Sequence, residues 1–114
     1  MLTLQALNEY GADTAQGLSR CMGNEAFYLR LVGMLAKDGH TQELADALAR
    51  RDLDAAFDAA HSLKGVLANL ALTPALTPIL EITEDMRARK DMDYQPLMDR
   101  IQTEMDRLMA LLKA

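Results

Sequence analysis

The sequence predicts an all-α protein, specifically an up-down four-helix bundle with short additional N-terminal helices. Half of the 114 residues are hydrophobic, yet only 4% are aromatic, and Leu, Ala and Met dominate. β-branched residues are scarce, and no segment alternates between apolar and polar side chains as a half-buried strand does. Apolar residues instead recur at spacings of three and four, which is typical of helices buried along one side.

Two short helices are expected at the start of the chain. A helix over residues 2–10 should end at Gly11, because glycine readily adopts the left-handed conformation that closes a helix. Asp13 is placed to cap the second helix, with Gln16 completing a capping box and Gly23 ending the helix.

A third and a fourth helix follow. Asn24 is the expected N-cap of the third, which runs to near Gly39. Its buried stripe is expected to consist of Phe27, Leu31, Met34 and Leu35. Thr41 should cap the fourth helix, and Arg50-Arg51-Asp52 should mark a boundary or a bend before the next helix, with Asp52 as its N-cap.

Three longer helices are expected in the rest of the chain. The first runs from about Asp52 to Leu72, and the second from Pro74 or Ala75 to about Lys90, since proline is tolerated in a first helical turn. After a turn over residues 91–93, the last helix carries apolar residues at spacings of 4, 3, 4, 3 and 4. These are Tyr94, Met98, Ile101, Met105, Leu108 and Leu112.

Composition excludes several classes of function. The net charge of −5 and the absence of a basic stripe disfavour nucleic-acid binding and binding to anionic membranes. A single cysteine, Cys21, cannot form an internal disulfide and is expected in the core. No signal peptide or run of about 20 apolar residues is apparent. We therefore expect one domain over residues 1–114, cytoplasmic and monomeric, with its eight methionines filling the core.

The position of His61 within its helix is the main functional signal. At about 100° per residue, the buried stripe lies roughly 160–240° from His61. That stripe comprises Ala56, Ala59, Leu63, Leu67 and Leu70. The residues within about 60° of His61 are Asp54, Phe57, Asp58, Lys64, Gly65 and Ala68. His61 is thus expected to face water beside a lysine, a glycine and an aromatic ring.

This arrangement points to a histidine that acts alone as a nucleophile. The sequence has no HExxH or CxxC metal motif, no plausible Ser-His-Asp set and no glycine-rich phosphate loop. Neutral imidazole attacks activated electrophiles, and Lys64 could neutralise an incoming phosphoryl group. Gly65 lacks a side chain that would obstruct a partner, although it could instead allow close helix packing. His40 is expected to be an ordinary exposed loop residue.

The segment Ala60-His61-Ser62-Leu63-Lys64-Gly65, followed by Asn69-Leu70, resembles the signature of histidine-containing phosphotransfer (HPt) domains. The resemblance extends to Asp52, to the helix from Leu76 through Glu81 and to the upstream segment over residues 23–28. It implies a four-helix bundle whose exposed histidine accepts a phosphoryl group from a receiver-domain aspartate and passes it to another receiver.

The resemblance also implies roles for individual residues. His61 would be the phosphoacceptor, with Lys64 and Gly65 as supporting residues, and Mg²⁺ would be held by the partner receiver domain. Receiver docking is expected through Phe57, Ala68 and Leu72. The chain carries Ala68 and Ala71 where family members commonly have glycine, and the methyl group of Ala68 bears on how closely a partner docks.

The sequence therefore predicts a stand-alone histidine phosphocarrier without turnover or a cofactor of its own. One alternative is an adaptor bundle that binds or sequesters a receiver domain without transferring phosphate. A second is a fragment or docking subunit of a histidine kinase, dimerised through the last helix.

Overall fold

The structure, a computed structural model, describes residues 1–113, so Ala114 at the end of the predicted domain lies outside it. Seven α-helices and one short 3-10 helix make up its regular structure, and the described residues include no strand. In chain order these are α1 (Leu4–Tyr10), α2 (Thr14–Arg20), α3 (Glu25–Gly33), the 3-10 helix η1 (Met34–Lys37), α4 (His40–Ala49), α5 (Leu53–Asn69), α6 (Thr73–Arg87) and α7 (Gln95–Lys113). The predicted fold class is confirmed.

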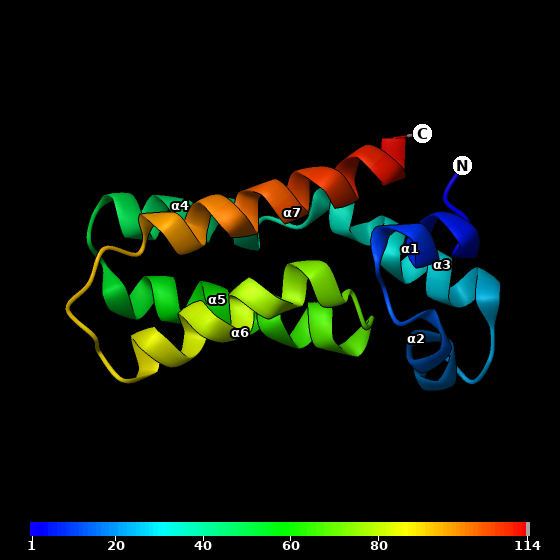
Figure 1. Ribbon diagram of the computed structural model, residues 1–114, viewed down its shortest axis with the longest axis horizontal. Helices are drawn as coiled ribbons and strands as arrows, with labels where there is room; N and C mark the ends of the chain where they lie inside the picture. The colour runs from blue at the N-terminus through cyan, green and yellow to red at the C-terminus, as the bar shows by residue number, and fades with distance from the viewer. Residues whose placement is uncertain (114) are drawn as a thin grey trace.

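The four longest helices, α4 to α7, form the up-down bundle (Figure 1). Helix α5 packs against both α4 and α6, and α6 packs against α7. Helices α1 to α3 gather at one end of the long axis, while the loop joining α6 to α7 turns at the other end. The four inner positions of the predicted seam lie in α7 and are buried, whereas Tyr94, just before the helix, and Leu112 are half-buried.

Helix α5 begins and ends for local reasons. Arg51 adopts a left-handed φ of 58°, and the side chain of Asp52 accepts a hydrogen bond from the backbone N–H of Ala55 at 3.0 Å, as expected of an N-cap. All five residues of the predicted stripe are buried. Ala60 is buried as well, so the α5 face in contact with its neighbours is wider than the sequence pattern indicated.

The first two helices largely follow the predictions. Gly11 closes α1 with a φ of 112°, and Asp13 caps α2 by accepting from the N–H of Gln16 at 3.1 Å. The reciprocal half of the capping box is not formed, because the N–H of Asp13 instead donates to the carbonyl oxygen of Ala71 at 2.9 Å. Cys21 is buried, as expected.

The predicted buried stripe of the third helix is correct at Leu35 but wrong at Phe27 and Met34, which are exposed. Tyr28 and Val32 face the core instead. Tyr28 fits inside because it lies over Gly17 of α2, where no side chain competes for the space. The α-helix also stops at Gly33 and continues only as the 3-10 turn η1. The expectation that the methionines fill the core is wrong for Met1, Met22, Met34 and Met92, which are all exposed.

The start of α4 also differs from the prediction. The helix begins at His40, so Thr41 lies inside it and does not cap it. His40 is not an exposed loop residue, because Nδ1 of its half-buried ring contacts Oδ1 of Asp38. The same carboxylate oxygen accepts from the backbone N–H of His40 at 3.3 Å.

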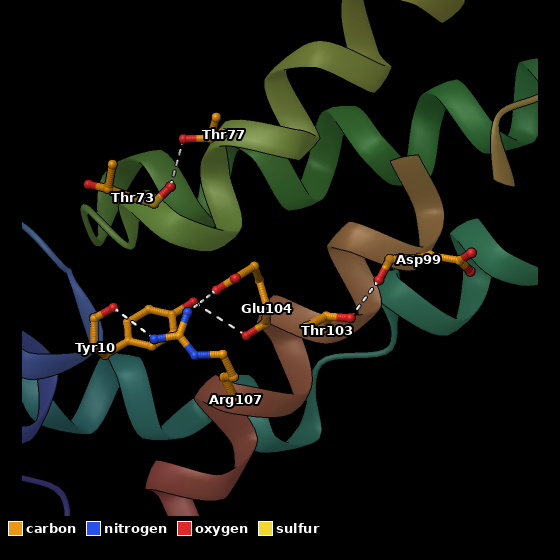
Figure 2. Close-up of polar contacts among 7 residues, drawn as sticks. All are labelled: Tyr10, Thr73, Thr77, Asp99, Thr103, Glu104 and Arg107. Carbon is orange, nitrogen blue, oxygen red and sulfur yellow. Dashed lines mark hydrogen bonds and ion pairs between the residues drawn. The ribbon is translucent and has the colours of Figure 1, made fainter. Parts of the chain in front are cut away.

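Helix α1 is fastened to α7 by one group of contacts (Figure 2). The hydroxyl of Tyr10 donates to the carbonyl oxygen of Glu104 at 3.4 Å, and Arg107 donates to the carbonyl oxygen of Tyr10 at 3.3 Å. The Arg107 guanidinium lies 4.9 Å from the centroid of the Tyr10 ring and pairs with Glu104 at 2.6 Å. Burial raises the pKa of Tyr10 to about 12.

Candidate functional site

His61 lies near the middle of α5 with its side chain exposed, as the helical pattern predicts. Its ring makes no hydrogen bond or ion pair with any residue of the 1–113 range. Its one ring contact is with Phe57, one turn earlier, at 5.9 Å between centroids and 17° between planes. Stacking restricts the rotation of the imidazole, while the side chain as a whole stays exposed to a reactant.

Phe57 is itself held in place by α6. The guanidinium carbon of Arg87 lies 5.3 Å from the centroid of the Phe57 ring, so the ring contacts a cation of α6 as well as the imidazole of His61. Sequence reasoning did not identify Arg87. Phe57 and Arg87 lie at equal distances in sequence from Leu72, in the turn between the two antiparallel helices. Residues at equal distances from such a turn lie opposite each other, so the sequence could have predicted this contact.

A groove of about 410 Å³ runs between α5 and α6 beside this stack. Its lining consists of Leu53, Asp54, Phe57, Asp58, Met86, Arg87 and Arg89. Arg89 pairs with Asp54 at 2.9 Å, but both side chains are largely exposed, so this ion pair contributes little to stability.

Lys64 and Gly65 lie one turn after His61 on the same side of α5. Lys64 is half-buried and forms no ion pair or hydrogen bond within residues 1–113, so its ammonium group is free to meet an anion. Apart from its two chain neighbours and the backbone of its own helix, a methyl group at Gly65 would meet no atom within 4 Å. Gly65 is therefore not required for helix packing, and the space beside it is open to a partner.

The end of α5 is held by the N-terminal helices. The carbonyl oxygen of Ala68 accepts from the guanidinium of Arg20, and that of Leu70 accepts from the hydroxyl of Tyr28 at 2.8 Å. The carbonyl oxygen of Ala71 accepts from the N–H of Asp13. These donors from α2, α3 and Asp13 tie the last turn of α5 and the two residues after it to the N-terminal part of the chain.

Leu72 is not available for docking, so its predicted place in a partner surface is wrong. The prediction assumed that α5 continues through Leu72, which would put this residue beside His61. The helix instead ends at Asn69, and Ala71 takes a left-handed φ of 56°. This reversal turns Leu72 into the core, where its side chain is 0% exposed. Phe57 and Ala68 are both half-buried and remain on the His61 side.

Two further properties of residues 1–113 bear on function. No group of three or more His, Cys, Asp or Glu side chains in that range is arranged to hold a metal ion. None of the helices that these residues form combines the length and apolar character needed to cross a membrane.

Comparison with known proteins gives one match. A family model described as "Hpt domain" matches residues 38–111, which cover α4, α5, α6 and nearly all of α7, including His61. Helices α1 to α3 and η1 lie outside the matched segment, as does the upstream part of the resemblance at residues 23–28. No curated protein and no solved structure matches the chain.

Proposed function

This chain belongs to the Hpt domain family, and from that membership we propose that it carries a phosphoryl group on His61 between receiver domains. Hpt domains are phosphocarriers that interact with receiver domains in phosphorelays. The observation that carries the assignment to His61 is its exposed imidazole, which has no hydrogen-bond partner in the described structure. The chain has one other histidine, His40, whose ring is engaged by Asp38.

The proposed chemistry is a single in-line displacement. An unprotonated ring nitrogen of His61 attacks the phosphorus atom of a receiver's aspartyl phosphate. The N–P bond forms as the bond from phosphorus to the aspartyl oxygen breaks, and the aspartate leaves as a carboxylate with the electron pair. The other ring nitrogen then releases its proton to water, which reaches the ring because the side chain is exposed. The reverse sequence passes the phosphoryl group to the next receiver.

Neighbouring residues assist this transfer by position and charge. The ammonium group of Lys64 would stabilise the negative charge of the phosphoryl group in transit, as cations do in phosphoryl transfer generally. Stacking on Phe57 limits the orientations of the imidazole, which reduces the entropy lost in reaching the in-line geometry. The open space at Gly65 leaves room for the partner to approach.

The partner completes the site. We expect the receiver domain to hold the Mg²⁺ that neutralises the phosphoryl oxygens, and this chain to need no cofactor of its own. The partly exposed surfaces of Phe57 and Ala68 flank His61 and would contact the receiver. This chain would therefore act as a transfer intermediate and show no turnover alone.

The test is to incubate the wild-type protein and two variants separately with a radiolabelled phosphorylated receiver domain. The wild type and His40→Gln should acquire label, whereas His61→Gln should not. The label should be lost in acid and retained in base, as expected of a phosphoramidate. An acid-stable label, or one that persists in His61→Gln, contradicts the proposal. Binding of a receiver without any label would instead identify the adaptor function.

A further inference from the structure

The aromatic ring beside His61 is not fixed by packing alone. Phe57 is half-buried, and it lines the groove of about 410 Å³ between α5 and α6. A ring that borders open space has room to change rotamer, because close-packed neighbours do not exclude the alternatives. The stacking of Phe57 on His61 therefore depends on a further contact that holds the ring in place.

Arg87 supplies that contact from the neighbouring helix. Its guanidinium carbon lies 5.3 Å from the centroid of the Phe57 ring, within the range of a cation–π interaction. The guanidinium is itself held on α6, since its Nε donates to Oε1 of Glu84, one turn earlier, at 3.3 Å. A continuous series of contacts thus joins α6 to the imidazole on α5, in the order Glu84, Arg87, Phe57 and His61.

A second arginine of the same groove makes a different contact. Arg89 donates to Oδ1 of Asp54 at 2.9 Å and has no ring contact within residues 1–113. The side chains of Arg87 and Arg89 are 52% and 70% exposed, so neither is part of the core. The two arginines carry the same charge two residues apart. They therefore separate the effect of a positive charge in the groove from the effect of a contact with Phe57.

We propose that Arg87 is a positioning residue for phosphoryl transfer, which acts by holding the Phe57 ring against the imidazole of His61. The inference rests on the proposed function and identifies a residue of α6 on which the transfer rate depends. Arg87 makes no hydrogen bond or ring contact with His61 itself in the described structure. With Phe57 held, the imidazole has fewer orientations to lose when a ring nitrogen meets the incoming phosphorus atom in line.

The test measures labelling of His61 by phosphoramidate, whose phosphorus atom is attacked by the ring nitrogen while ammonia leaves. This small donor needs no docking surface, so its rate reports on the histidine itself. Arg87→Met removes the cation but keeps a long side chain, and it should lower the rate constant about two- to fivefold, as expected for loss of an exposed cation–π contact. Arg87→Lys keeps a cation and should retain most of the rate. The matched control, Arg89→Met, should be labelled as the wild type is.

A double-mutant cycle and an NMR measurement show whether Arg87 acts through Phe57. Phe57→Leu keeps an apolar side chain but removes the ring, so Arg87→Met added to it should slow labelling no further. The ring current of Phe57 should shift the imidazole protons of His61 upfield in the wild type. This shift should decrease in Arg87→Met and persist in Arg89→Met, whereas a purely structural role for Arg87 predicts no such difference between two folded variants.

Three results would overturn the inference. The first is an unchanged rate in Arg87→Met, and the second is equal slowing by Arg89→Met, which would assign the effect to charge alone. The third is further slowing by Arg87→Met in the Phe57→Leu background, which would mean that Arg87 acts on the reactants without the ring. All three leave the proposed function intact. Failure of both phosphoramidate and a phosphorylated receiver domain to label the wild type would remove the proposed function itself.

Discussion

Two stretches of the chain, one within α5 and one at its C-terminal end, have opposite surroundings. From His61 to Gly65 the helix is open, with an imidazole that lacks hydrogen bonds and a glycine whose added methyl group would touch nothing. From Ala68 to Ala71, three carbonyl groups accept hydrogen bonds from the N-terminal part of the chain. The open stretch keeps the reactive group accessible, and the fastened stretch fixes the helix that carries it. Stability and transfer should therefore respond separately to substitutions in the two stretches.

Two helical glycines make this contrast measurable. Both Gly17 and Gly65 lie in helices, where glycine costs roughly 0.5–1 kcal/mol relative to alanine. A methyl group at Gly17 would lie 2.5 Å from the ring of Tyr28, whose hydroxyl is bonded to the end of α5. The same addition at Gly65 meets open space. The same substitution should therefore have opposite signs at the two positions.

The largest effect is expected for Gly17→Ala. The buried Tyr28 ring has no room to move without losing its hydrogen bond to Leu70, so the variant should lose about 1–3 kcal/mol of unfolding free energy, typical of overpacking. Gly65→Ala, the matched control, should gain roughly 0.5–1 kcal/mol. Urea denaturation followed by circular dichroism measures both. Equal urea midpoints for the two variants would show that Tyr28 can move to accommodate the methyl group, contrary to the prediction.

A smaller but more specific effect is expected for Gly65→Gln. The long side chain should raise the urea midpoint slightly, because a good helix former replaces glycine at a position without neighbours. The same side chain should obstruct a partner and slow transfer from a phosphorylated receiver by about tenfold, or ~1.4 kcal/mol in the barrier. A variant that is stable and transfers at the original rate would assign no steric role to the space beside His61. One that unfolds easily would mean that Gly65 is needed for packing.

The smallest effect concerns the two alanines that replace common family glycines. Ala71 has a φ of 56°, a conformation that costs an alanine roughly 1–2 kcal/mol. Ala71→Gly removes this strain but increases the conformational entropy of the unfolded chain. The net effect should be a stabilisation of up to about 1 kcal/mol. Ala68 lies within α5, so Ala68→Gly should instead destabilise it by roughly 0.5–1 kcal/mol. Thermal unfolding distinguishes the two signs, and stabilisation by both would contradict the helical assignment of Ala68.

Sequence periodicity located α5 and the exposed position of His61 because one face of this helix is clearly more apolar than the other. It failed on α3, where two apolar rows lie side by side and hydrophobicity alone gives no reason to prefer either. The choice depends on a distant residue, since Gly17 leaves room for Tyr28 and thereby sets the rotation of α3.

Contacts across the fold account for the other errors. A helical wheel extended past Asn69 places Leu72 beside His61, but a left-handed residue just before Leu72 reverses the chain and buries it. The contact between Arg87 and Phe57 likewise joins two helices that local sequence patterns do not pair. Local patterns thus predict which residues are exposed on a helix but not which helices lie beside them.

The hydrogen bonds from residues 13–28 to the end of α5 also have a consequence for folding during synthesis. Tyr28 leaves the ribosome 42 residues ahead of its acceptor, Leu70. At translation rates of about 5–20 residues per second, this separation corresponds to roughly 2–8 s. During that interval the apolar side chains of α1 and α3 have no core to enter, because the helices that cover them are not yet synthesised. The N-terminal helices should therefore be the segment of the nascent chain most exposed to chaperones, and the last to become protected from hydrogen exchange.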